Sequence, residues 1–175
     1  MITIVSGTNR RDSNTAKVAK LYYDYLQSKG VESTLLDLVD FPTDFISPDM
    51  YEPAKSDSIK KLQDDILFPT TKYIMVVPEY NGSIPGIFKL MIDAVDIKNA
   101  FYHKKACLTG VSTGRAGNLR GLDTLTNMLH YIKMDVFQLK IPISGFGKLM
   151  DEKGNFTDQA TIDLLKQQTD QFIDF

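Results

Sequence analysis

The segment MITIVSGTNRRDSNTAKVAKLYYDYLQSKG, residues 1–30, predicts the architecture of this chain. It begins with β-branched and apolar residues at positions 1–5, which predict a buried strand. Residues 15–28 then place Val, Ala, Leu and Tyr side chains at helical spacing, and Gly30 follows as a C-cap. A strand that passes through a polar turn into an amphipathic helix begins a β-α-β unit, so a parallel sheet is expected.

The same alternation continues along the chain. Further strands are predicted at 32–38, 73–77, 106–112 and 136–141, and further helices at 55–67, 85–94, 118–132 and 158–172. Right-handed crossovers would turn this series into an α/β fold: a doubly wound, five-stranded parallel sheet with helices on both faces. Its expected strand order is the flavodoxin-like 2-1-3-4-5. Because no linker or repeat interrupts the pattern, residues 1–175 are predicted to form a single domain.

The composition excludes several classes of function. Twenty Lys and Arg residues against 22 Asp and Glu give a formal charge of −2, which provides no basic surface for nucleic acid or an anionic membrane. The single cysteine, Cys107, allows no intrachain disulfide and no Cys-rich metal site. No signal-peptide pattern opens the chain, and no stretch approaches the roughly 20 apolar residues that span a bilayer. A cytoplasmic protein without a membrane or nucleic-acid partner is therefore expected.

The first turn, SGTNRRDSNT at residues 6–15, is rich in groups that bind anions. A helix N-terminus offers unpaired N–H groups and a positive dipole end, and hydroxyl groups can donate to phosphate oxygens. The plainer interpretation is that Ser13 or Asn14 is only a helix N-cap. Arg10, Arg11 and Lys17 stand where acidic residues usually complement the helix dipole, which favours an external anion. The turn matches neither the Walker pattern nor the dinucleotide fingerprint, so a phosphate of another kind is predicted.

Two further loops are expected beside this turn, because ligands in doubly wound folds bind at the carboxyl ends of the strands. The loop at residues 78–86, PEYNGSIPG, is stiffened by prolines and could present the Tyr80 ring to a flat heterocycle. Taken alone, its Asn-Gly pair is better interpreted as a simple turn. The loop at residues 112–121, STGRAGNLRG, either allows close backbone approach to a ligand or is a plain glycine-rich connection.

Together the three loops resemble the NADPH-dependent FMN reductase family, flavodoxin-like flavoproteins that include azoreductases, quinone reductases and chromate reductases. The resemblance extends from residue 1 to about residue 145, and PEYNGSIPG is its most specific motif. It implies an FMN phosphate held by Ser6, Thr8, Arg10, Ser13, Asn14 and Thr15. It further implies that the flavin ring contacts Pro78, Glu79, Tyr80, Asn81, Ser112, Thr113 and Gly114.

The reaction implied by the resemblance is hydride transfer from NADPH or NADH to bound FMN. Electrons would then pass to a second acceptor such as a flavin, a quinone, an azo compound or a metal oxyanion. Because the cofactor performs this chemistry, no catalytic side chain and no metal site is expected, and His103 and His130 are interpreted as structural. Two alternatives remain: a flavodoxin-type electron carrier, and a flavin-binding redox sensor without direct NAD(P)H activity.

The chain departs from the family pattern in the helix at 85–94 and in the third loop. Leu90 and Ala94 stand where relatives often have Asn and Trp. The apolar residues of this helix exceed what one sheet contact would hide, so a homodimer or a dimer of dimers is predicted; these residues include Phe88, Met91 and Ile92. In the third loop, Arg115 either faces the substrate or is a solvated surface charge.

Overall fold

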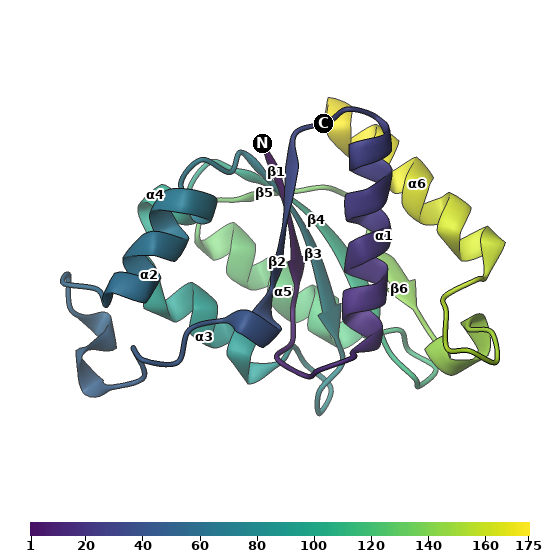
Figure 1. Cartoon of the computed structure of the whole chain (residues 1–175), viewed down its shortest axis with the longest axis horizontal. Coiled ribbons are helices and arrows are strands. Elements are labelled where there is room, and N and C mark those ends of the chain that lie inside the picture. Colours follow the sequence, from purple (N-terminus) through teal and green to yellow (C-terminus); the bar gives the residue numbers. More distant parts are fainter.

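A parallel β-sheet runs through the middle of the molecule, between two layers of helices (Figure 1). The computed structural model describes residues 1–175, apart from the side chain of Pro48. The strands are β1 (Ile2–Ser6), β2 (Ser33–Asp37), β3 (Lys72–Pro78), β4 (Lys105–Val111), β5 (Asp135–Val136) and β6 (Ile141–Ile143). They are parallel in the order β2-β1-β3-β4-β5, and β6 also pairs with β4. The predicted order 2-1-3-4-5 is confirmed.

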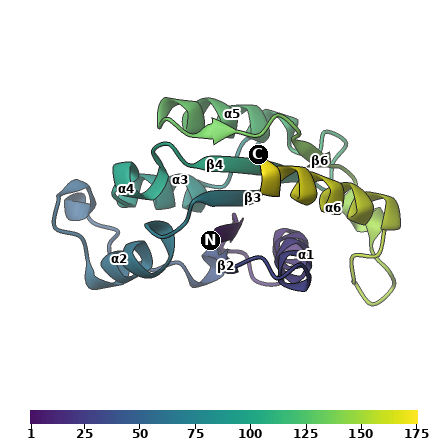
Figure 2. The same ribbon diagram turned by 90° about the horizontal axis from the view of Figure 1, so that it is seen from above.

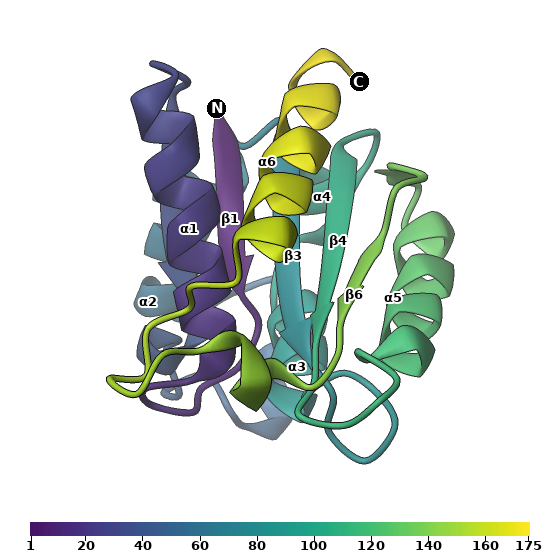
Figure 3. The ribbon, with the colours of Figure 1, turned by 90° about the vertical axis from the view of Figure 1, so that its right-hand side faces the viewer.

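The helices cover both faces of the sheet, as Figures 2 and 3 show from two further directions. One face carries α1 (Asn14–Ser28) and α6 (Gln159–Asp174). The other carries α2 (Asp57–Leu62), α3 (Gly86–Ala94), α4 (Ile97–Phe101) and α5 (Leu119–Tyr131). A π-helical turn, Gln63–Leu67, extends α2, and 3₁₀ turns occupy Leu38–Asp40, Pro48–Tyr51 and Phe146–Leu149. No helix within the described part of the chain has the length and apolar character to cross a membrane.

Helix α1 is fixed by its sequence at both ends and along one face. Ser13 is the N-cap, and its hydroxyl oxygen accepts a hydrogen bond from the Ala16 N–H at 3.0 Å. Gly30 ends the helix with a φ of +70°, which confirms its predicted role after the last turn. Val18 and Leu26 are fully buried against the sheet, and burial of such side chains contributes about 1.5–3 kcal/mol each. Local capping and tertiary packing therefore specify the same helix.

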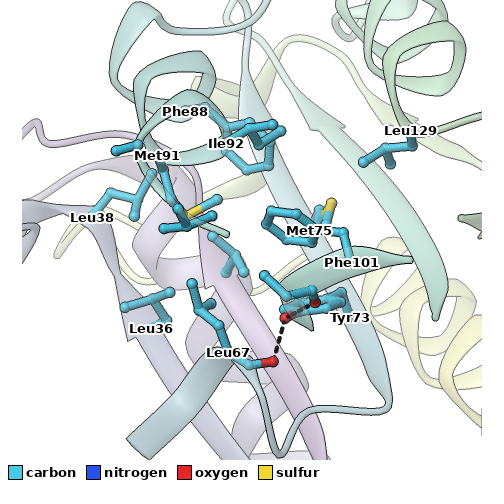
Figure 4. Packing of buried hydrophobic residues seen from close by; sticks show 14 of the residues in the cluster. Leu36, Leu38, Leu67, Tyr73, Met75, Phe88, Met91, Ile92, Phe101 and Leu129 are labelled. Atoms are coloured by element: carbon cyan, nitrogen blue, oxygen red, sulfur yellow. Dashed lines mark hydrogen bonds between the residues drawn. The ribbon is translucent and has the colours of Figure 1, made fainter. Parts of the chain in front are cut away.

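The apolar residues of α3 belong to the core of their own chain. Phe88 and Met91 are fully buried and Ile92 is 2% exposed. Figure 4 shows these three side chains pointing toward the sheet, where they pack with Met75 and the residues at the end of β2. The prediction that they form an exposed apolar surface is wrong, because one sheet contact and the 3₁₀ turn after β2 cover them. The predicted homodimer thus stays a prediction that rests on the family resemblance alone.

The predicted strand at 136–141 is divided into β5 and β6. Val136 pairs with Ala106 and Ile141 pairs with Thr109, so the edge chain contains two extra residues between these pairs. The amide of Gln168, on α6, donates hydrogen bonds there to the carbonyl oxygens of Leu108 at 3.3 Å and Leu139 at 2.7 Å. The strand is interrupted because a buried side chain, rather than the neighbouring backbone, satisfies these carbonyl groups.

Gln168 also completes a buried polar network. Its side-chain oxygen accepts a hydrogen bond from the Tyr22 hydroxyl, which lies 2.6 Å from the Thr109 hydroxyl oxygen. All three side chains are fully buried, so each polar atom depends on the others for its hydrogen bonds. The network joins α1, β4 and α6 inside an otherwise apolar layer.

We predict that Gln168→Met lowers the free energy of unfolding by about 2 kcal/mol or more, because it leaves buried polar groups without partners. The matched control is Gln167→Met, an exposed neighbour on the same helix, which should change the value by less than about 0.5 kcal/mol. Urea unfolding of both variants measures the difference. Equal midpoints for the two variants would contradict this account of the network.

The chain leaves β1 by passing unusually close to β3. The Gly7 N–H donates to the Val76 carbonyl oxygen at 2.8 Å. A Cβ atom at Gly7 would lie 2.8 Å from that oxygen and 2.8 Å from a methyl carbon of Val77. Gly7 is not among the glycines with positive φ, so the absence of a side chain matters here rather than backbone freedom. Glycine therefore places the first polar turn directly beside the end of β3.

Gly7→Ala is expected to lower the free energy of unfolding by about 1–3 kcal/mol, because the added methyl group forces β1 and β3 apart. Gly147→Ala is the control, since a Cβ atom there would meet no heavy atom within 4 Å. Thermal or urea unfolding compares the two. A Gly7→Ala protein as stable as the control would show that the turn can relax without cost.

Candidate functional site

Three loops meet at the carboxyl ends of β1, β3 and β4. Figure 1 shows them below the sheet, whereas both chain termini lie at the opposite end. The Glu79 N–H donates to the Val111 carbonyl oxygen at 3.0 Å, which joins the second loop to the end of β4. The hydroxyl oxygens of Thr8 and Tyr80 lie 2.8 Å apart, which joins the first loop to the second. The loops enclose an open cavity of about 240 Å³.

Most of the side chains predicted for a ligand site line this cavity. The lining residues are Thr8, Arg10, Asp12, Ser13, Asn14, Thr15, Pro78, Glu79, Tyr80, Val111, Ser112 and Thr113. Asp12 and Val111 were not predicted. Asp12 lies between residues that were, but its negative charge is unfavourable for an anion, and Val111 is an ordinary strand residue by sequence. Their only signal in the sequence is position: Asp12 lies between Arg10 and Ser13, and Val111 directly precedes Ser112.

Three predicted residues do not line the cavity. Ser6 is fully buried at the end of β1, and its hydroxyl has no hydrogen-bond partner among the described residues. Asn81 is exposed and has a φ of +53°; with Gly82 it forms a tight turn closed by two backbone hydrogen bonds between Tyr80 and Ser83. The interpretation of this pair as a turn is confirmed. Gly114 does not line the cavity, although its N–H donates to the hydroxyl oxygen of Ser112, which does, at 3.0 Å.

One end of the cavity is the N-terminus of α1. Ser13 caps the helix through the Ala16 N–H, which leaves the hydroxyl hydrogen of Ser13 free to donate. The backbone N–H groups of Asn14 and Thr15 have no hydrogen-bond partner within the described chain. Unpaired N–H groups and the positive end of the helix dipole favour a negatively charged group at this position.

Lys17 does not line this end of the cavity. Its ammonium group donates to the Gly154 carbonyl oxygen at 2.6 Å and lies 3.5 Å from the sulfur of Met150. The Lys17 ammonium group is therefore already hydrogen bonded within the chain, so its place in the first turn does not support the prediction of an external anion. A larger hollow of about 630 Å³ lies along this side of α1 and borders none of the three loops. Arg10 is the basic residue that lines the candidate site.

The opposite wall of the cavity carries Tyr80. Its hydroxyl group is hydrogen bonded to Thr8, whose side-chain oxygen also accepts from the Arg10 N–H at 3.2 Å. Thr8 is fully buried, so its hydrogen bond to the Tyr80 hydroxyl fixes the tyrosine to the first loop. The aromatic ring is thereby positioned as part of a rigid wall next to Pro78 and Glu79.

The cavity is lined mainly by hydroxyl, amide and charged side chains. Its ionisable side chains are Arg10, Asp12, Glu79 and Tyr80. Cys107 lies within β4, where burial raises the pKa of the thiol well above its usual value and keeps it protonated. In the part of the chain that the structure describes, no group of three or more His, Cys, Asp or Glu side chains could hold a metal ion.

Comparison with known proteins places this geometry in a family. The chain is 25% identical over 163 residues to a quinone reductase of Pseudomonas putida KT2440, with 91% of this chain and 86% of that protein covered. It is similar to the structure of FerB, a flavoenzyme NAD(P)H:(acceptor) oxidoreductase from Paracoccus denitrificans, at a TM-score of 0.81 and 25% identity, covering 99% and 94% of the two chains.

A flavodoxin from the domain Archaea shares the fold at a TM-score of 0.61 and 13% identity, with 98% of each chain covered. The family model described as NADPH-dependent FMN reductase matches residues 1–146, which include all three loops. This family implies FMN and NAD(P)H as cofactors and oxidoreductase activity. With its flavodoxin-like sheet and its cavity at the carboxyl ends of the strands, the chain belongs to the NADPH-dependent FMN reductase family.

Proposed function

We propose that this protein binds FMN in the cavity between the three loops and transfers hydride from NAD(P)H to it, for delivery to a second acceptor. The supporting observation is the pairing, in one cavity, of unpaired helix N–H groups with a rigid tyrosine-bearing wall. FMN carries both a phosphate and a flat ring system, and each half of the cavity suits one of them.

The phosphate would be held at the start of α1. The N–H groups of Asn14 and Thr15, the Ser13 hydroxyl and the Arg10 guanidinium can all donate there. Thr8 is already hydrogen bonded to Tyr80 and to the backbone of Arg10, so it supports the phosphate loop from below. Ser6 is omitted from this set, because its side chain is buried outside the cavity.

The flavin ring would lie along the second and third loops, against Pro78, Glu79, Tyr80, Ser112 and Thr113. When bound, FMN accepts hydride from a nicotinamide and passes electrons to an acceptor, and the protein positions the reactants and excludes water. The hydrogen bond between Tyr80 and Thr8 links this ring wall to the phosphate loop. In this proposal, a change in the phosphate loop would therefore also move the wall that orients the ring.

A quinone is the first acceptor to test, because a relative that covers most of the chain is described as a quinone reductase. Flavins, azo compounds and metal oxyanions are further candidates. Anaerobic addition of NADPH or NADH to the FMN-loaded protein should bleach the flavin absorbance, and a quinone should restore it. Absence of bleaching would instead support the electron carrier or the redox sensor.

We predict that Arg10→Gln weakens FMN binding roughly tenfold to a hundredfold, because hydrogen bonds to charged groups are worth about 1.5–3 kcal/mol. Arg11→Gln removes the same charge from an adjacent exposed residue outside the cavity and should have a smaller effect. Titration by flavin fluorescence measures both affinities, and excess FMN should restore the activity of Arg10→Gln. Equal effects of the two substitutions would argue against a specific phosphate contact.

Tyr80→Ala should lower turnover about tenfold or more even at saturating FMN, because it removes the wall against which the reactants are positioned. The control is Tyr131→Ala on α5, where the side chain is 87% exposed and far from the three loops. Steady-state kinetics with NADPH and a quinone gives kcat for each variant. A Tyr80→Ala enzyme with unchanged kcat would remove the ring wall from the mechanism.

A further inference from the structure

All four arginines of the chain lie in the two strand-to-helix segments that border the candidate site, three in the loops and Arg120 in the first turn of α5. Arg10 and Arg11 lie between β1 and α1, and Arg115 and Arg120 lie between β4 and the first turn of α5. The sixteen lysines are distributed over the rest of the molecule, including α2, α4 and α6. Arginine is the residue best suited to planar, two-point binding of phosphate groups. The confinement of arginine to these two segments therefore points to anionic ligands.

The arginine side chains are not used to stabilise the protein. Within the described part of the chain, every ion pair is made by a lysine or by the N-terminal amine. No arginine side chain donates a hydrogen bond to another described residue. Asp123, three residues after Arg120, lies 3.5 Å from Lys140 instead. The guanidinium groups of Arg115 and Arg120 thus have no hydrogen-bond or ion-pair partner among the described residues.

The position of Arg120 connects it to the ring wall of the cavity. A Cβ atom at Gly82 would lie 3.9 Å from the Arg120 guanidinium, so this side chain reaches the turn that follows Tyr80. Its helix is anchored by Asn118, which is fully buried and donates from its side-chain amide to the Val77 carbonyl oxygen at 3.0 Å. Arg115 is exposed in the same loop, two residues after Thr113 of the cavity. Both arginines therefore flank the ring end of the site rather than the phosphate end.

We propose that Arg115 and Arg120 form a second anion-binding site, which binds the phosphate groups of the nicotinamide dinucleotide. This inference rests on the proposed function, in which FMN occupies the cavity and its phosphate takes the site at Arg10. A nicotinamide that reaches the flavin ring brings a pyrophosphate with it, and the negative charges need cationic partners beyond the ring. Quinones and azo compounds without acidic groups have no such requirement. The arginine pair consequently serves the donor half of the reaction.

The test compares Arg115→Gln/Arg120→Gln with a control, Lys98→Gln/Lys133→Gln, which removes the same charge near the amino end of β4. FMN-loaded proteins are mixed anaerobically with NADPH or with 1-benzyl-1,4-dihydronicotinamide, a hydride donor without phosphate groups, and flavin bleaching is followed by stopped flow. In the arginine variant, the NADPH concentration for half-maximal rate should rise roughly tenfold to a hundredfold and depend less on salt. Its rate with the benzyl donor should change less than twofold.

Several results would overturn the inference. An unchanged NADPH dependence would do so, as would an equal loss with the control or with the benzyl donor. Reoxidation by anthraquinone-2,6-disulfonate and by 1,4-benzoquinone forms a second arm: an effect confined to the anionic quinone, with NADPH unaffected, would assign the arginines to the acceptor. Failure of the proposed function has a different signature, because the parent protein itself would then not be bleached by NADPH.

Discussion

The close approach of Gly7 to the end of β3 is the constraint on which the site depends. Its N–H is bonded to Val76, and no side chain could fit between the two strands at this point. The contact brings the first loop beside the second, so the Thr8 hydroxyl can meet that of Tyr80. The groups proposed to bind the phosphate and those proposed to contact the ring therefore lie on two loops that this short backbone contact brings together.

The two ends of the sheet use their cations differently. At the amino end of the strands, Lys72 donates to carbonyl groups in the last turn of α6, and Lys104 donates to the carbonyl oxygens of Leu67 and Phe68. Partial burial lowers the pKa of Lys104 to about 8. At the carboxyl end, the arginines have no partner among the described residues. One end supports the fold, and the other is left available for anions.

Particular residues show how far the sequence could predict this arrangement. The alternation of strands and helices predicted the sheet order, because the local spacing of apolar residues distinguishes a strand from a helix. Phe88 and Met91 were predicted to lie on an exposed surface, and this was wrong. The sheet and the turn that cover them are formed by residues distant in the sequence. The charge of Lys17 was read as favouring an external anion, because its hydrogen-bond partner at Gly154 is more than a hundred positions away and could not be foreseen from the turn. The division of the last strand depends likewise on Gln168, from another helix.

Local residue preferences account for the parallel α/β architecture, the capped start of α1, the Asn-Gly turn and the three polar loops. Which residues of these loops share a cavity depends instead on how the loops pack against one another. Ser6, Thr8 and Ser13 are equivalent as hydroxyl groups in the sequence, yet the first is buried outside the cavity, the second supports Tyr80, and the third caps the helix with a hydrogen still free to donate. The sequence of the turn does not contain the residues responsible for two of these differences, because Ser6 is buried by the surrounding sheet and Thr8 is bonded to Tyr80 in another loop.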